Sequence, residues 1–311
     1  MAINCDYLMC AVLSCAALHM HIHQPGDHKM RRAAHDYFGN AILVLRRQLP
    51  QINSSNADLV FAASILIAFQ SSTLWLDPCN KCDPSYRLPV QWLQMEQGVG
   101  KVLRAAAKPG ALHSMRPLLE ILPRKSVPGE VQDGLFRALG AAVNSAFDED
   151  VETERAIRCA LGHVMSIFRG IWTGEGGPMT RRRLLMFPVL LQPRFIEVLE
   201  AHDPRAIVLL AYFFAATKVV DQHWWLKGRA EYEVKGMLSL LPEEWKEHLA
   251  WPLAVVLEGE AAVRRSELGP SSLALTESSE EAAESVMCCL SRSPTFSPSV
   301  SVYTGCSVTS C

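Results

Sequence analysis

The longest run of apolar residues lies between positions 206 and 220, where Thr217 and Lys218 are the strongly polar exceptions. Asp203 is a favourable N-cap, and Pro204 stands where the first turn of a helix tolerates proline. A helix that is apolar on all sides lies either in the core of a large domain or in a membrane. Because the run is shorter than the roughly 20 residues that a spanning helix needs, the pattern predicts a central core helix.

Helical periodicity continues on both sides of this segment. Residues 4–20 place Leu8, Met9, Val12, Leu13, Ala16 and Met20 on one helical face, which we expect to pack against the core. Further helices are predicted at 28–49, 57–75, from 89 onward, 111–122, 130–146, 151–170, 179–201 with breaks at Pro188 and Pro193, 229–241, and from Pro242 to the closing pair Trp251–Pro252. No alternating strand pattern of useful length occurs, so the predicted fold class is all-α, a multi-helix domain.

The composition changes after residue 258. Residues 259–311 are rich in Ser, Glu and Thr and include Ser293–Pro294 and Ser297–Pro298. Such a segment cannot bury enough apolar surface to offset the entropy lost on ordering. We therefore expect a helical domain over 1–258 and a disordered tail over 259–311. The tail either only solvates the chain or serves as an activation or phosphorylated segment.

Composition and charge narrow the function classes. The formal net charge of the 311 residues is −2, which gives no overall basic footprint for nucleic acid. Ten scattered cysteines are typical of a reduced, intracellular protein and do not indicate a disulfide framework. No secretory signal is expected, because the residues before the first apolar segment include Asp6 and contain no Lys or Arg. No apolar run is long enough to predict a membrane span.

Signals for catalysis or metal binding are weak. Cys79 and Cys82 form a C-x-x-C pair without further ligands, and His19 and His23 share a helical face near a helix C-terminus, where histidine favours the helix dipole. Three arginines at 181–183 follow a Gly-rich loop that lacks the Lys-Ser/Thr ending of a phosphate-binding loop. No nucleophile with a base is recognisable, so we predict no catalytic residue, no metal ligand and no cofactor, and the chain is not expected to be an enzyme.

An ordered set of segments resembles a known family. DYLMCAVLSCAALHMHI, AHDYFGNAI and SNADLVFAASILIAF are followed by WLQMEQGVGKVL, by DPRAIVLLAYF, and by the pairs Trp224–Trp225 and Trp251–Pro252. In this order they resemble the C-terminal regulatory domain of fungal binuclear zinc-cluster transcription factors, above all the sterol uptake control regulators. The resemblance covers approximately residues 4–258.

The resemblance implies an all-helical regulatory domain of RNA polymerase II transcription that forms homo- or heterodimers. It also implies an apolar pocket for a sterol or a similar lipid, and a nuclear protein that shuttles from the cytoplasm. The residues that we expect to line this pocket are Phe61, Phe69, Tyr212, Phe213, Thr217, Trp224 and Trp225. Ordinary core packing is the alternative for each of them.

The sequence departs from the family in one respect. The zinc-cluster head of these factors uses six closely spaced cysteines among basic residues. Here Cys159 is the next cysteine after Cys79 and Cys82, and no basic cluster surrounds them. We therefore expect a fragment, a truncated gene model or a paralogue without the head, which would reach DNA only through a missing N-terminal segment. The alternative is a headless interaction protein that pairs with a full-length factor and modulates it.

Overall fold

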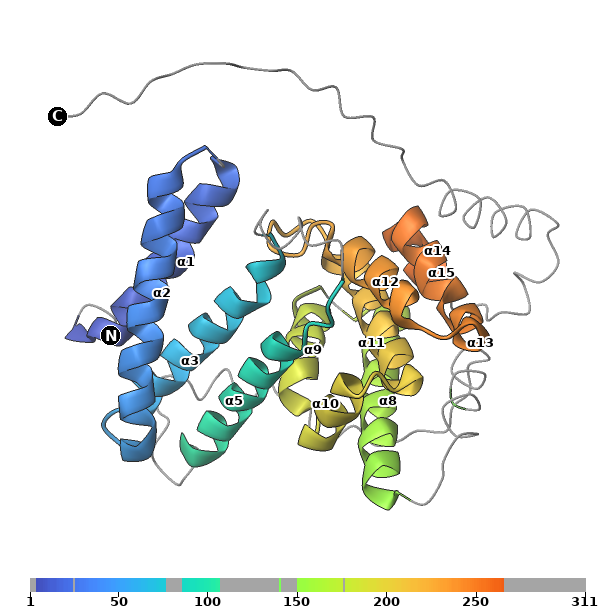
Figure 1. The fold of residues 1–311 in the computed structure, drawn as a ribbon, viewed down its shortest axis with the longest axis horizontal. Coiled ribbons are helices and arrows are strands. Elements are labelled where there is room, and N and C mark those ends of the chain that lie inside the picture. Colours follow the sequence, from blue (N-terminus) through green and yellow to red (C-terminus); the bar gives the residue numbers. More distant parts are fainter. Residues whose placement is uncertain are drawn as a thin grey trace, which may run out of the picture. The chain divides into compact units, whose positions relative to one another are not determined.

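The computed structural model describes residues 4–24, 26–76, 86–106, 140, 150–175 and 177–265. Within these ranges every regular element is a helix, and no strand occurs. The all-α prediction is confirmed (Figure 1). The described residues contain no helix that is long and apolar enough to cross a membrane. The helices predicted at 111–122 and 130–146 lie outside the described residues, apart from residue 140.

The first helices form an N-terminal core. Helix α1 (Asp6–His23) packs along α2 (His28–Gln48), and α3 (Ala57–Ser72) packs against both of them and against α5 (Val90–Ala106). The side chain of Asp27 caps α2 by accepting hydrogen bonds from the next backbone N–H groups. Buried residues of these helices make one apolar cluster, which we call the N-terminal core: Cys5, Tyr7, Leu8, Ala11, Ala41, Leu45, Ala57, Val60, Phe61, Ala63, Ile67, Ala68, Val99, Val102 and Ala106.

The face of α1 that meets this core is only in part the one that the sequence predicted. Leu8 of the predicted face is buried, but Val12, Leu13 and Met20 are 40%, 37% and 51% exposed, whereas Ala11, Ser14 and Ala17 on the other side of the helix are buried. The hydroxyl of Ser14 donates to the carbonyl of Ala34 at 2.6 Å. Small side chains allow α1 and α2 to approach closely, so close backbone packing decided the orientation over side-chain hydrophobicity.

The remaining helices form a C-terminal core around α11 (Pro204–Ala216), in which every residue from 206 to 216 is buried. This confirms the predicted core helix, although its last turn, Thr217–Val220, is a 3-10 helix. The elements around it are α8 (Val151–Trp172), α9 (Gly177–Leu190), α10 (Pro193–Glu200), α12 (Arg229–Leu240), α13 (Glu243–Lys246), the 3-10 turn Glu247–Leu249, α14 (Ala250–Glu258) and α15 (Glu260–Arg265).

Helix α5 belongs to both cores. Its first turn places Trp92 and Leu93 in the C-terminal core, and its later turns place Val99 and Val102 in the N-terminal core. Figure 1 shows α5 between α3 and α9, and it packs against both. One helix therefore connects the two apolar clusters.

Two predicted breaks are wrong. Pro188 does not interrupt α9, which continues to Leu190 with the buried proline in its last turn. Trp251 and Pro252 do not close a helix but lie in the first turn of α14, where proline is tolerated. For Pro252 the start of the helix, which the sequence pattern did not define, decided the outcome.

Ordered structure continues past the boundary expected at residue 258. Helix α15 follows Gly259, and its Val263 is fully buried. The indole N–H of Trp172 donates to the carbonyl of Val263 at 3.0 Å, which ties α15 to α8. A disordered tail cannot begin before this helix ends, and residues 266–311 lie outside the described residues.

Candidate functional site at the joint between the two cores

Three of the seven predicted pocket residues are held by core packing. Phe61 is 3% exposed within the N-terminal core. In the C-terminal core the ring of Tyr212 stacks on Trp251 with centroids 5.2 Å apart, and the ring of Phe213 stacks on Phe187 at 4.3 Å. A neighbouring ring therefore covers a face of each of these two rings, as expected if the residues serve ordinary core packing.

One expected polar group of the pocket has a local partner. The hydroxyl of Thr217 donates to the carbonyl of Phe214 at 2.6 Å, which is a bond within the same helical segment. Burial raises the pKa of Tyr212 well above its usual range, so its phenol remains protonated.

The other three predicted residues come together. Phe69 of α3 meets Trp224 and Trp225 with ring centroids 6.1 and 5.5 Å apart, both edge to face. His19 of α1 contacts Trp224 at 4.9 Å, and His223 stacks on Trp225 at 6.2 Å. Helices α1 and α3 of the N-terminal core thus contact the segment that precedes α12 through aromatic rings. We call this contact, made by His19, Phe69, Ser72, Trp224, Trp225 and Arg229, the joint.

Buried polar atoms without partners lie on the segments that form the joint. Gln70 is 4% exposed, and its side-chain oxygen has no hydrogen-bond partner among the described residues. The Nε2 atom of His223 and the Nδ1 atom of His21 are also buried and have no hydrogen-bond partner among the described residues. A buried polar group without a partner costs free energy, so such atoms are expected where a ligand or a bound water completes the structure.

A buried ion pair lies beside the aromatic rings. Arg229 begins α12 and pairs with Glu233 one turn later, with Nε donating to Oε1 at 3.3 Å and side chains 3% and 2% exposed. The Nη1 atom of Arg229 donates to the carbonyl of Ser72, the last residue of α3, at 2.7 Å. The hydroxyl of Tyr86 donates to the second oxygen of Glu233 at 2.6 Å. We call Arg229, Glu233, Tyr86 and the Ser72 carbonyl the lock.

Aromatic rings and a second carboxyl surround the lock. The guanidinium carbon of Arg229 lies 4.3 Å from the centroid of Trp92 and 5.2 Å from that of Phe214, within cation–π range. The indole N–H of Trp92 donates to Glu96 at 3.1 Å. Burial raises the pKa of Glu96 to about 7, against the opposing effects of this hydrogen bond and of the charge of Arg229. Burial also raises the pKa of Glu233, which the facing Arg229 opposes.

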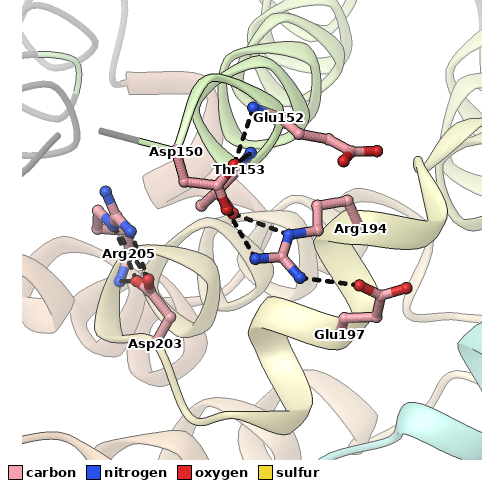
Figure 2. A network of polar contacts seen from close by, with 7 residues as sticks. All are labelled: Asp150, Glu152, Thr153, Arg194, Glu197, Asp203 and Arg205. Carbon is pink, nitrogen blue, oxygen red and sulfur yellow. Dashed lines mark hydrogen bonds and ion pairs between the residues drawn. The ribbon is translucent and has the colours of Figure 1, made fainter. Parts of the chain in front are cut away.

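A second polar network, away from the joint, connects α8 to α10 (Figure 2). Asp150 caps α8, and its carboxylate pairs with Arg194 at 2.7 Å. Arg194 also pairs with Glu197 at 2.9 Å and donates to the hydroxyl of Thr153. Hydrogen bonds from Thr153 and Arg194 hold the pKa of Asp150 well below its usual range. Because every member finds its partner within the network, we interpret it as a structural tie.

A surface hollow of about 310 Å³ lies on the first half of α2 and is lined by His28, Arg31, Arg32 and His35. The lining is basic, and none of the residues predicted to bind a lipid belongs to it. It is therefore not the predicted apolar pocket.

Among the described residues no cluster of three or more metal-ligating side chains occurs. Arg183 pairs with Glu175 at 2.7 Å. Cys159 contacts His163 at 3.5 Å, but burial lowers the pKa of His163, so the ring stays neutral and does not stabilise a thiolate. The pair Cys79 and Cys82 lies outside the described residues.

Comparisons with known proteins agree with the resemblance at the level of the family. Residues 1–117 match the fungal specific transcription factor domain. The chain is 29% identical over 294 residues to a Zn(2)-C6 fungal-type transcription factor of Gibberella zeae, with 89% of this chain and 57% of that protein covered. It is 26% identical over 207 residues to the Zn(2)-C6 fungal-type transcription factor afumD of Aspergillus fumigatus, with 65% and 54% covered.

No solved structure matches the chain significantly. The chain spans little more than half the length of the two relatives that it matches. Its N-terminal part therefore corresponds to a fungal transcription factor domain, and the chain is homologous to Zn(2)-C6 fungal-type transcription factors.

Proposed function

We propose that this chain is a non-enzymatic regulatory domain that controls RNA polymerase II transcription in the manner of a fungal zinc-cluster factor. The observation that carries the proposal is the similarity to a Zn(2)-C6 fungal-type transcription factor over 89% of the chain. Contact with DNA would be made by a zinc-cluster segment, since these 311 residues contain no run of six closely spaced cysteines. Residence in the nucleus, shuttling from the cytoplasm and dimerisation are parts of the same proposal.

The effector in this proposal is a sterol or a similar apolar lipid. Sites for such ligands combine aromatic walls with a few polar groups that fix orientation. Phe69, Trp224 and Trp225 supply the aromatic surface at the joint, and Gln70 and His223 offer buried atoms that have no hydrogen-bond partner within the described part of the chain. The site that we propose is therefore narrower than the one predicted from the sequence, because it excludes the rings that stack within the cores.

Binding of a fluorescent sterol to the full chain tests the effector. We expect saturable binding and a rise in melting temperature, since a ligand at about 100 times its Kd stabilises the folded state by roughly 2.7 kcal/mol. Trp225→Ala should weaken binding at least about tenfold, which corresponds to the roughly 1.4 kcal/mol expected from losing one aromatic contact. Unlabelled sterol and an unlabelled fatty acid serve as competitors, to distinguish a sterol from a lipid in general.

The control variant is Trp245→Ala, because Trp245 is also partly buried against the C-terminal core but lies in α13, away from the joint. Both variants should lose similar thermal stability, and only Trp225→Ala should lose affinity. Equal losses of affinity would assign Trp225 to ordinary packing. Absence of saturable binding in the unmodified chain would refute the effector proposal and leave the family assignment intact.

A further inference from the structure

Besides the apolar packing of α5, the two cores meet at the joint, which is chemically different from the interior of either core. Within each core the helices meet through aliphatic and aromatic side chains. At the joint, α1 and α3 contact residues 224–229 through the ring of His19, the ring of Phe69 and the Ser72 carbonyl, which meet two tryptophan rings and the guanidinium of Arg229. Apolar burial is non-directional, whereas these contacts depend on orientation. The relative placement of the cores is therefore sensitive to a few polar groups.

Arg229 contacts side chains or backbone of four separate helices. Its guanidinium binds the C-terminal carbonyl of α3, pairs within α12, and lies over the rings of Trp92 in α5 and Phe214 in α11. The positive charge beside this carbonyl also interacts favourably with the negative, C-terminal end of the α3 dipole. One side chain thus holds the end of the N-terminal core against three helices of the C-terminal core.

Close packing around Tyr86 restricts how the residues of the lock can be arranged. The Tyr86 ring covers Gly236, one turn after Glu233, and a Cβ atom at position 236 would overlap that ring. This close approach places the Tyr86 hydroxyl on Glu233, which in turn holds Arg229. The groups therefore support one another only when α3, α12 and the Tyr86 segment are all in place.

The energetics of a buried ion pair indicate specificity. Desolvation of both ions offsets much of their attraction, so a buried pair adds little net stability relative to apolar residues of similar volume. Loss of one partner alone is strongly destabilising, because it leaves an uncompensated buried charge. Such a pair discriminates sharply between the arrangement that satisfies it and any that does not.

We infer that the lock is a conformational switch element, which fixes the closed arrangement of the two cores and whose release lets α3 separate from the segment before α12. Separation would expose the joint, including Phe69 and Trp225, while each core keeps its own apolar packing. The equilibrium between the closed and the separated arrangement is a property of the chain itself, and it does not depend on which effector binds.

Hydrogen–deuterium exchange of the full chain tests the inference with the double variant Arg229→Met/Glu233→Leu, which removes both charges together. At pH 6, where the nearby Glu96 is mostly protonated, no lone buried charge remains, so the midpoint of global unfolding should stay close to that of the unmodified protein. Exchange should nevertheless become at least tenfold faster in the last turn of α3 and in residues 221–229. Helices α8 and α10 should keep their exchange rates.

The matched control is Arg183→Met/Glu175→Leu, which removes an ion pair of the C-terminal core that does not touch the joint. It should leave exchange at the joint unchanged. A second variant, Tyr86→Phe, deletes only the hydroxyl that holds Glu233 and should accelerate exchange at the same peptides to a smaller extent. Unchanged exchange at the joint in both lock variants, or a uniform increase over all helices, would overturn the inference.

Discussion

Replacing Glu96 by glutamine should make the stability of the protein less dependent on pH near neutrality. Burial raises the pKa of this carboxyl from 4.5 to about 7, against the indole N–H of Trp92 and the charge of Arg229. The folded state therefore binds the proton of Glu96 more tightly than the unfolded chain does. Glutamine resembles the protonated carboxyl in shape and can still accept the hydrogen bond from Trp92.

The sign and size of the effect follow from this raised pKa. The contribution of Glu96 is fully present below pH 4.5, declines as the pH rises through about 7, and is absent above it. A shift of this size corresponds to at most about 3.5 kcal/mol, since one pKa unit equals roughly 1.4 kcal/mol. The Glu96→Gln variant should therefore match the unmodified protein near pH 4 and exceed its free energy of unfolding by up to about 3.5 kcal/mol near pH 8.

Urea unfolding at a series of pH values measures this difference directly. The control is Glu244→Gln, because Glu244 is exposed at the start of α13 and should give a curve parallel to that of the unmodified protein. The NMR signal of the Trp92 indole N–H provides a local readout, which should titrate in the unmodified protein and stay constant in Glu96→Gln. Parallel stability curves for Glu96→Gln and the unmodified protein would refute the reasoning.

Two further predictions concern a helix and the boundary of the domain. Gly236→Ala should lower the free energy of unfolding by about 1–3 kcal/mol because it displaces the Tyr86 ring, although alanine is the better helix former by roughly 1 kcal/mol; a stabilised variant in urea unfolding would show that the ring moves freely. Truncation after Arg265 should leave the melting temperature unchanged, whereas truncation after Glu258 should cost about 1–3 kcal/mol by removing the buried Val263. Equal melting temperatures for the two truncations would show that α15 contributes nothing.

The sequence alone was sufficient for the helical class and for the central helix. A run of apolar residues with a capping Asp203 and a tolerated Pro204 determines a buried helix locally, and the structure confirms it in α11. The similarity to fungal zinc-cluster transcription factors could also be recognised, because an ordered series of helical segments is a property of the sequence itself. The orientation of α1 could not be predicted in the same way, because close packing of small residues buries Ala11 and Ser14 and leaves the larger Leu13 exposed.

Tertiary structure alone decided the composition of the joint and of the lock. Arg229 and Glu233 stand four residues apart, a spacing that in most helices marks a solvated ion pair. Here the end of α3 and the ring of Trp92 cover the pair and remove it from water. Burial depends on which distant segments pack over a residue, and that information is spread over the whole chain. For the same physical reason, the sequence could predict aromatic residues for a pocket but could not distinguish Phe69 and Trp225, which meet at the joint, from rings that stack inside a core.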